Sequence, residues 1–199
     1  MSKFILAGVA SLIVGALACG AVLAQDETAT LKVEAADLTN QYGTNLMSAL
    51  QGAIEKNGPL GAVEVCHDEA PRIAADLSRQ SGWTIARTSL KPRNSASAPD
   101  EYERATMETF AARIAQGEDA AKIASAEIVY RNDGKSSGFV KSFRFIKAIP
   151  TGELCLTCHG SDIDPYLKRK MDALYPNDRA TGFKLGEMRG VFTSSKQLN

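Results

Sequence analysis

Residues 122–149, KIASAEIVYRNDGKSSGFVKSFRFIKAI, contain the pattern that decides between an all-helical fold and a mixed one. Two segments, 122–130 and 139–149, are rich in Ile, Val, Phe and Tyr, as strands are, although neither alternates perfectly. Asn132-Asp133-Gly134 and Gly138 supply turn residues between them. The stretch therefore predicts a β-hairpin, which speaks against a helical bundle.

The chain before this stretch has helical spacing. Between Asp37 and Lys56 an apolar residue recurs at every fourth position, which predicts a helix that ends at Asn57-Gly58-Pro59. The residues on this face are Leu38, Tyr42, Leu46, Leu50 and Ile54.

A second predicted helix has Cys66 near the centre of its apolar stripe. The stripe steps by three and four residues from Val63 to Leu77. Pro71 lacks a backbone donor and crowds the carbonyl of His67, so we expect this helix to be kinked or broken beside Cys66.

The remaining segments complete an α+β pattern. Helices come first and antiparallel strands follow, an order typical of α+β proteins. The predicted elements are a strand at 83–88, a loop at 89–99, a helix at 100–116 stopped by Gly117, a helix at 165–174, a loop at 176–186 and a strand at 188–194.

Composition and charge exclude some classes of partner. Lys and Arg together number 23, as do Asp and Glu, and the two signs are interspersed. No basic stripe indicates nucleic acid or an acidic membrane surface, and charge does not identify a protein partner.

The first 24 residues have the composition of a secretory signal peptide. Lys3 is the only charge, and an apolar run from Phe4 to Leu23 precedes a small-residue site at Val22-Leu23-Ala24. We predict cleavage after Ala24 and export to the periplasm, leaving one domain at 25–199. Two alternatives would attach the protein to a membrane: retention of the run, which approaches the ~20 residues that span a bilayer, and lipidation of Cys19.

Cys155-Leu156-Thr157-Cys158-His159 is the most specific motif of the chain. Two thiols separated by two residues can add to the two vinyl groups of a haem, and the next histidine can bind the iron from the same side. If Cys19 leaves with the signal, three cysteines remain, so at least one does not form an internal disulfide. We therefore predict one covalently bound haem c.

Two other interpretations of the motif are weaker. Zinc needs four ligands, and only Cys66 and His67 could complete the set, at an unusual spacing. A thioredoxin-like redox pair usually opens a helix after a βαβ-type strand in a cytosolic protein, whereas this chain is predicted to be exported.

The second axial position of the iron has few candidates. On a helix Cys66 and His67 diverge by ~100°, and Cys66 lies nearer the apolar stripe. Cys66 could equally be a buried small hydrophobe. The thioether candidates are Met47, Met107, Met171 and Met188, of which Met47 and Met107 fit a hydrophobic core better.

Several segments resemble those of the single-haem c-type family first seen in cyanobacteria, over residues from about 38 to the C-terminus. They are Glu64-Val65-Cys66, Ala70-Pro71-Arg72-Ile73-Ala74, Gly82-Trp83-Thr84-Ile85-Ala86-Arg87-Thr88-Ser89, Arg93-Asn94, Cys155-Leu156-Thr157-Cys158-His159-Gly160, Tyr175-Pro176 and Arg189-Gly190. The resemblance implies a PAS-like α+β domain with N-terminal helices, and iron held by His159 and Cys66. The loop at 95–99 departs from the family pattern, so contacts are not transferred there.

Three functions follow as alternatives. The first is a redox or gas sensor, in which reduction weakens the bond to Cys66 and a diatomic ligand such as CO or NO can bind. The second is a periplasmic electron carrier that keeps both ligands, which the lack of an output domain favours, and whose redox partner is unknown. The third is a helical-bundle cytochrome, which the predicted strands oppose.

No catalytic constellation is present in the sequence. There is no nucleophile with a base, no paired acid and base, and no phosphate loop, so we predict that the protein is not an enzyme. Arg93, with Lys91 and Arg87, could hold the haem propionates, although solvated surface cations are the simpler interpretation.

Overall fold

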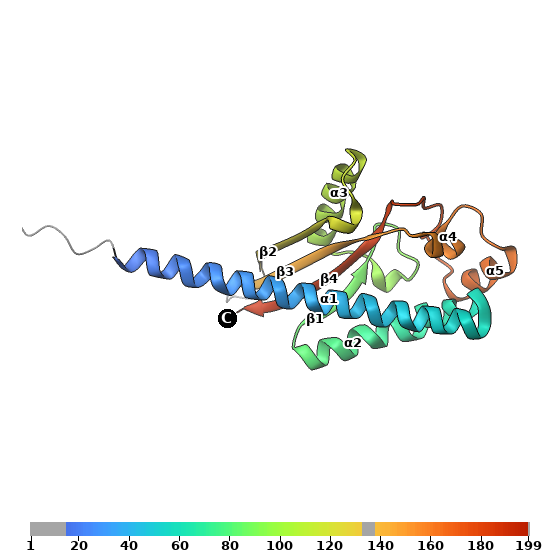
Figure 1. The fold of residues 1–199 in the computed structure, drawn as a ribbon, viewed down its shortest axis with the longest axis horizontal. Helices are drawn as coiled ribbons and strands as arrows, with labels where there is room; N and C mark the ends of the chain where they lie inside the picture. Colours follow the sequence, from blue (N-terminus) through green and yellow to red (C-terminus); the bar gives the residue numbers. More distant parts are fainter. Residues whose placement is uncertain (1–14, 133–137, 199) are drawn as a thin grey trace, which may run out of the picture.

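The structure is a computed structural model that describes residues 15–132 and 138–198, with the backbone alone for residues 15–26. It has the predicted α+β architecture (Figure 1). The elements in chain order are α1 (Gly15–Glu64), η1 (Val65–Glu69), α2 (Ala70–Ser81), β1 (Thr84–Thr88), η2 (Ser95–Ser97), α3 (Glu101–Ala115), η3 (Ala120–Lys122), β2 (Ala124–Asn132), β3 (Phe139–Pro150), α4 (Glu153–His159), α5 (Pro165–Leu174) and β4 (Met188–Leu198).

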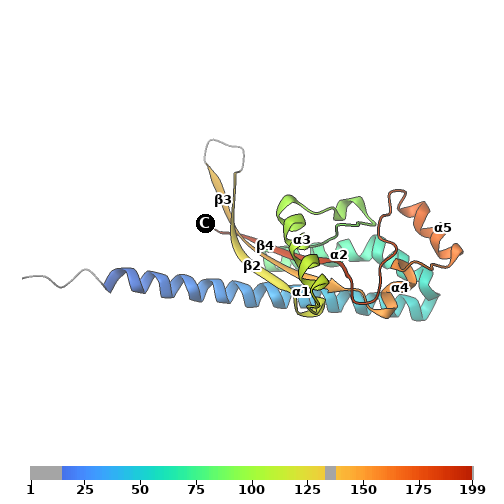
Figure 2. The same cartoon turned by 90° about the horizontal axis from the view of Figure 1, so that it is seen from above.

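The four strands form one antiparallel sheet in the order β1-β4-β3-β2. The predicted hairpin is confirmed, because β2 pairs with β3 from Ala124 opposite Lys147 to Asn132 opposite Phe139. Its far end projects from the body of the molecule (Figure 2). Asp133 and Gly134 of the predicted turn lie outside the described residues.

Helices cover both faces of the sheet. On one face α1, η1 and α2 bury Tyr42, Leu46 and Leu77 against Trp83 and Phe143. On the other face α3 packs against the sheet in a second cluster: Met107, Phe110, Ile123, Ile146, Ala148 and Val191. Because strand side chains alternate, β3 contributes to both cores.

The two predicted breaks in the helical layer are present. Helix α1 kinks at Gly58, whose φ of 65° suits glycine, and continues through Pro59. At η1 one π-helical turn replaces the regular helix, and the amide of Ala70 donates to the carbonyl of Val65. Pro71 then lies in the first turn of α2, where its missing donor costs nothing.

Most other elements match their predicted ranges. Asp100 caps α3 in a reciprocal capping box with Glu103, and α5 begins and ends as predicted. Two differences concern α4, a short helix that was not predicted, and β4, which continues to Leu198. Seven residues are too few to show helical periodicity.

The N-terminal predictions fall largely outside the described residues. Residues 1–14 and the side chain of Cys19 are not described, and the backbone of α1 is continuous from Gly15 through residue 24. Cleavage, retention and lipidation therefore stay predictions. In the described residues, no helix is both long and apolar enough to cross a membrane.

Candidate functional site

Helix α4 carries the two thiols and the imidazole of the CxxCH motif. It ends at Gly160, whose amide donates to the carbonyl of Leu156 at 2.9 Å. A Cβ atom at position 160 would lie 2.6 Å from that carbonyl oxygen. The glycine after the motif therefore allows the chain to turn away directly behind His159.

The segment 178–183 holds His159 through both its backbone and its side chain. The carbonyl of His159 accepts from the amide of Phe183 at 2.9 Å, and Nδ1 lies 2.7 Å from the carbonyl oxygen of Ala180. A carbonyl can only accept, so Nδ1 carries the proton in this contact. The lone pair of the neutral ring is then on Nε2, as in histidines that bind metals through that atom.

The electrostatic surroundings keep this imidazole neutral. Burial lowers the pKa of His159 well below its usual value, and the nearby guanidinium groups of Arg189 and Arg93 lower the pKa further. The hydrogen bond to Ala180 acts in the opposite direction and is smaller. A neutral buried imidazole is the form that can donate an electron pair to iron.

Arg93 and Asp178 form a buried ion pair that supports the same segment. Arg93 Nε lies 2.9 Å from Asp178 Oδ2, and Arg93 Nη2 donates to the carbonyls of Cys158 at 2.5 Å and Ala180 at 3.2 Å. The second oxygen of Asp178 accepts from the amide of Ala180 at 2.7 Å. Arg93 is thus occupied in fixing α4 and its support, and its contact with a haem propionate stays a prediction.

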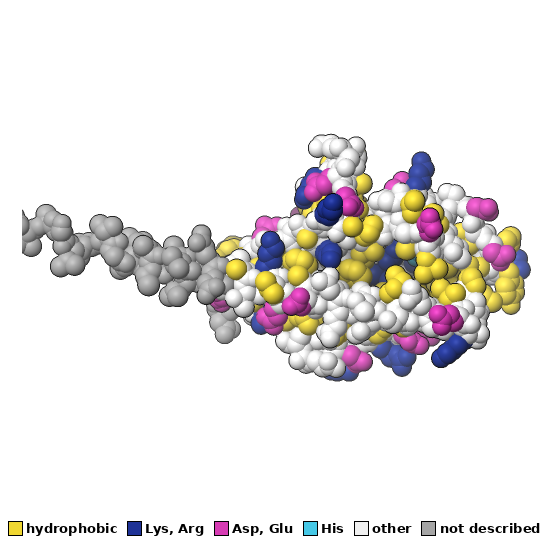
Figure 3. Space-filling view, viewed as in Figure 1, with side chains coloured by type: hydrophobic (Ala, Val, Ile, Leu, Met, Phe, Trp, Pro, Cys, Tyr) yellow, Lys and Arg dark blue, Asp and Glu magenta, His cyan; other side chains and the backbone are white. Residues whose placement is uncertain are grey.

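Two adjoining cavities, of about 200 and 330 Å³, are lined in part by residues of α4. Both are mainly apolar; the smaller, called the polar cavity, is the one that the polar loop after β1 lines, and the larger, called the apolar cavity, runs along α1. Figure 3 shows a hollow bordered by hydrophobic side chains with Lys or Arg atoms inside it. The residues that line both cavities are Cys66, Arg87, Arg93, His159, Tyr175 and Arg189.

The structure separates Cys66 from His67 as the helical geometry predicts. Cys66 faces both cavities, whereas His67 lines neither and instead places Nδ1 2.6 Å from Asp68 Oδ1. The ring of His67 packs against Tyr175, with centroids 5.4 Å apart. Cys66 of η1 and His159 of α4 therefore each line both cavities. Among the described residues, no other Cys or His does so.

The methionine predictions hold in part. Met107 is fully buried in the core under α3, but the expectation that Met47 is a core residue is wrong. Met47 is 42% exposed at the rim of the apolar cavity, because its neighbour Leu46 faces the core and successive helical side chains diverge. Met171 and Met188 line neither of the two cavities.

The three described cysteines are unpaired. Cys155 and Cys158 line the apolar cavity, and burial raises the pKa of the Cys158 thiol although Arg93 opposes this shift. Within the described part of the chain, no group of three or more His, Cys, Asp and Glu side chains could hold a metal ion. The arrangement does not supply the four-ligand set that zinc prefers, whereas a haem iron takes only two axial ligands from the protein.

Sequence reasoning missed the support of His159 and one arginine of the cavity wall. Asp178 lies 85 residues from Arg93 in the chain, and no local pattern connects them. Arg189 was noted only within the resemblance, and its contribution to both cavities depends on sheet pairing.

These features define a class of protein: an α+β domain whose helical layer and sheet enclose a cavity faced by a CxxCH helix. A family model described as Tll0287-like matches residues 20–196, and the chain belongs to this family. The crystal structure of the cyanobacterial heme-protein Tll0287 has a similar fold, with a TM-score of 0.57, 18% sequence identity, and coverage of 88% of this chain and 96% of that one. A comparison with curated proteins found no match.

Proposed function

We propose that this protein is an exported, PAS-like, single-haem c-type protein that acts as a redox or gas-ligand sensor rather than as an enzyme. Cys155 and Cys158 would hold the haem covalently, with His159 and Cys66 as axial ligands. The structural relative Tll0287 is a heme-protein, which supports a haem cofactor in this chain. The observation that carries the proposal is the orientation of His159, whose Nδ1 is bonded to Ala180 while Cys66 faces the same cavities.

The residues of the site fit the demands of such a cofactor. The thiols of Cys155 and Cys158 are free and line an apolar cavity suited to a porphyrin edge. The neutral imidazole of His159 offers Nε2, and burial also raises the pKa of Tyr175 to about 12, so this wall residue stays uncharged. A bound haem supplies one-electron redox chemistry and a site for a diatomic ligand.

The support for a sensor comes from the segment that carries Cys66. Cys66 lies in the π-helical turn η1, a type of irregularity frequent at functional sites. Among the described residues no hydrogen bond holds its sulfur. We therefore propose that Cys66 would be the less firmly held of the two iron-binding residues and His159 the firmly held one, and that the haem would supply the site for CO or NO.

The cofactor is tested by expressing the full chain in a host that attaches haem to c-type proteins in the periplasm. Wild-type protein should carry one haem by mass spectrometry and a c-type pyridine haemochrome spectrum, whereas Cys155→Ser with Cys158→Ser should carry none. Periplasmic fractionation with N-terminal sequencing tests export and cleavage after Ala24. Wild-type protein without covalent haem would overturn the proposal.

The ligand and the function are tested by spectroscopy. We expect Cys66→Ala to change the ferric EPR and near-infrared spectra, while Met47→Leu leaves both unchanged. CO binding to the reduced wild type supports the sensor. Reversible one-electron titration without CO binding or ligand change would instead favour the periplasmic electron carrier, whose redox partner protein would then have to be sought.

A further inference from the structure

Arg189 occupies an unusual position in the sheet. In the pairing of β3 with β4, Ile149 faces Gly190 and Pro150 faces Met188, so Arg189 is the extra residue of a β-bulge. A bulge leaves one residue outside the ladder and re-aims its side chain. Here the re-aimed residue lines both cavities.

Close contacts with the end of β1 fix the bulge. A Cβ atom at position 190 would lie 2.5 Å from the carbonyl oxygen of Thr88, so the strands approach closely only because Gly190 has no side chain. The hydroxyl of Ser89 donates to the carbonyl of Arg189 at 2.6 Å. The backbone of Arg189 is therefore held from the neighbouring strand.

The charges of the cavity wall are unbalanced. Arg93 is neutralised by Asp178, and Lys91 Nζ donates to the carbonyl of Thr181 at 2.6 Å and lies over the ring of Phe183. Within residues 15–132 and 138–198, no ion pair or hydrogen bond engages the guanidinium of Arg87 or of Arg189. No described Asp or Glu lines either cavity.

The two free guanidinium groups repel each other. Burial lowers the pKa of Arg189 to about 10, and Arg87 is the next largest cause of that shift. With this pKa, Arg189 still carries its charge at neutral pH. Uncompensated charges in such surroundings are costly, so a protein that retains two of them on the walls of the same cavities is expected to place an anion between or beside them.

The thiols of Cys155 and Cys158 lie at only one of the two cavities. Cys155 and Cys158 line the apolar cavity alone, whereas the polar cavity is lined by Ser89, Asn94 and Ser97 of the loop after β1. The vinyl groups and the two propionates of a haem lie on opposite edges of the ring. A haem attached at the thiols would therefore present its carboxylates toward the polar cavity.

We propose that Arg87 and Arg189 form the binding site for the two propionate carboxylates of the haem. This assignment rests on the proposed haem attachment. The sequence analysis named Arg93, with Lys91 and Arg87, as candidates for this contact. The assignment keeps Arg87, adds Arg189 and leaves out Arg93, because Arg93 already has a carboxylate partner. Guanidinium groups are suited to this contact because their donors match the geometry of a carboxylate.

The test follows the titration of the propionates in the haem-loaded full chain. Cells supplied with 5-aminolevulinate labelled with carbon-13 at its carboxyl carbon make haem whose propionate carboxyls are labelled. Infrared difference spectra against pH then report the ionisation of these groups alone. An adjacent cation lowers a carboxyl pKa by about 1–3 units, so we expect Arg189→Gln and Arg87→Gln each to raise the propionate titration midpoint by about 1–2 pH units.

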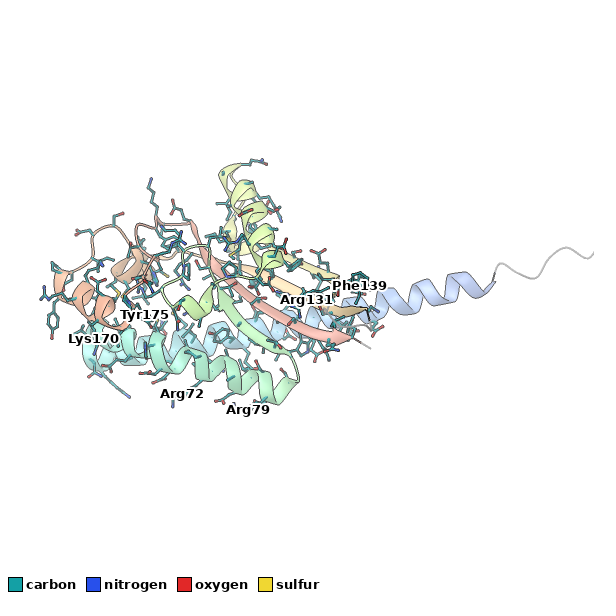
Figure 4. All side chains as sticks on the ribbon, turned by 180° about the vertical axis from the view of Figure 1, so that it is seen from behind. Arg72, Arg79, Arg131, Phe139, Lys170 and Tyr175 are labelled. Carbon is teal, nitrogen blue, oxygen red and sulfur yellow. The ribbon has the colours of Figure 1, made fainter. Side chains whose placement is uncertain are left out.

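Two variants serve as controls. Arg189→Lys keeps the charge and should give a smaller upward shift than Arg189→Gln. Arg72→Gln removes an exposed arginine on the outer side of α2 (Figure 4) and should leave the midpoint unchanged.

The outcomes separate this assignment from the haem proposal itself. If wild-type protein carries haem but neither glutamine variant shifts the midpoint more than Arg72→Gln does, Arg87 and Arg189 do not bind the propionates and only this assignment is wrong. If Arg93→Gln alone shifts it, the sequence prediction for Arg93 is right instead. If wild-type protein carries no covalent haem, both proposals are wrong.

Discussion

His159 and Cys66 face the same cavities, but they differ in how firmly hydrogen bonds hold them. His159 is held by hydrogen bonds to Ala180 and Phe183, and a buried ion pair fixes the segment that contains both. Cys66 lies in a π-helical turn, and no described residue bonds to its sulfur. The difference indicates that the His159 side of the site is rigid and that the Cys66 side is freer to move.

The largest expected effect comes from breaking the rigid side. Asp178→Ala leaves Arg93 buried without a partner and removes the acceptor for the amide of Ala180. We expect the free energy of unfolding to fall by about 3–5 kcal/mol in denaturant titrations. The exposed pair of Lys168 and Asp172 is the control, because Asp172→Ala should cost only about 0.3–0.5 kcal/mol; equal losses in both variants would show that the buried pair has no special role.

Gly160 behind His159 and Gly52 on α1 give a pair of substitutions with opposite expected signs. Gly160→Ala forces a Cβ atom against the carbonyl of Leu156 and should lower the free energy of unfolding by about 1–3 kcal/mol. Gly52→Ala lies on α1, where nothing is within 4 Å of the added atom, and should raise it by about 0.5–1 kcal/mol. Thermal and denaturant unfolding measure both, and a neutral Gly160→Ala would mean that α4 is less constrained than its contacts indicate.

The pH dependence of stability should report the neutral His159. Its pKa is lowered in the folded state by burial, Arg189 and Arg93, so below ~6.5 the unfolded chain binds a proton that the folded chain does not. In haem-free protein, the free energy of unfolding should therefore decrease as the pH falls from ~7 toward the folded pKa, by up to ~1.4 kcal/mol per pH unit. His67→Gln should keep this slope and His159→Gln should lose it; an unchanged slope in His159→Gln would contradict the assignment.

The smallest effect concerns local opening in the wild type. Hydrogen exchange should be faster at the amide of Ala70, which closes the π-helical turn, than at Gly160, Gly182 and Phe183 around His159. A tenfold ratio corresponds to ~1.4 kcal/mol of opening free energy. NMR exchange rates measure this ratio. Slower exchange at Ala70 would show that the Cys66 side of the site is the more rigid one.

Local chemistry explains which features the sequence predicts well. Pro71 predicts the irregularity beside Cys66 because its ring cannot continue a regular helix, and the kink in α1 follows from the positive φ of Gly58. The CxxCH motif is contiguous, so its spacing alone identifies His159 as a candidate ligand. The hairpin is recognised because β-branched and aromatic residues flank a turn.

The features that sequence did not predict depend on contacts between distant segments. The partner of Arg93 lies in a loop with no periodicity, and the position of Arg189 depends on a one-residue irregularity in strand pairing. The expectation for Met47 is wrong because the general tendency of methionine to be a core residue does not show that its neighbour Leu46, not Met47, faces the core. All three concern the surface that a side chain meets, whereas the missed helix α4 was too short to show a period.

The place of β4 between β1 and β3 has a consequence for the order of assembly. β1 pairs only with β4, and β4 follows every other described element in the chain. During synthesis, β1 and the hairpin cannot be joined into one sheet until residues 188–198 have emerged. The wall of the cavity that contains Arg87 and the helix that contains the CxxCH motif therefore come together late, so the thiols of Cys155 and Cys158 stay exposed until the last strand has joined the sheet.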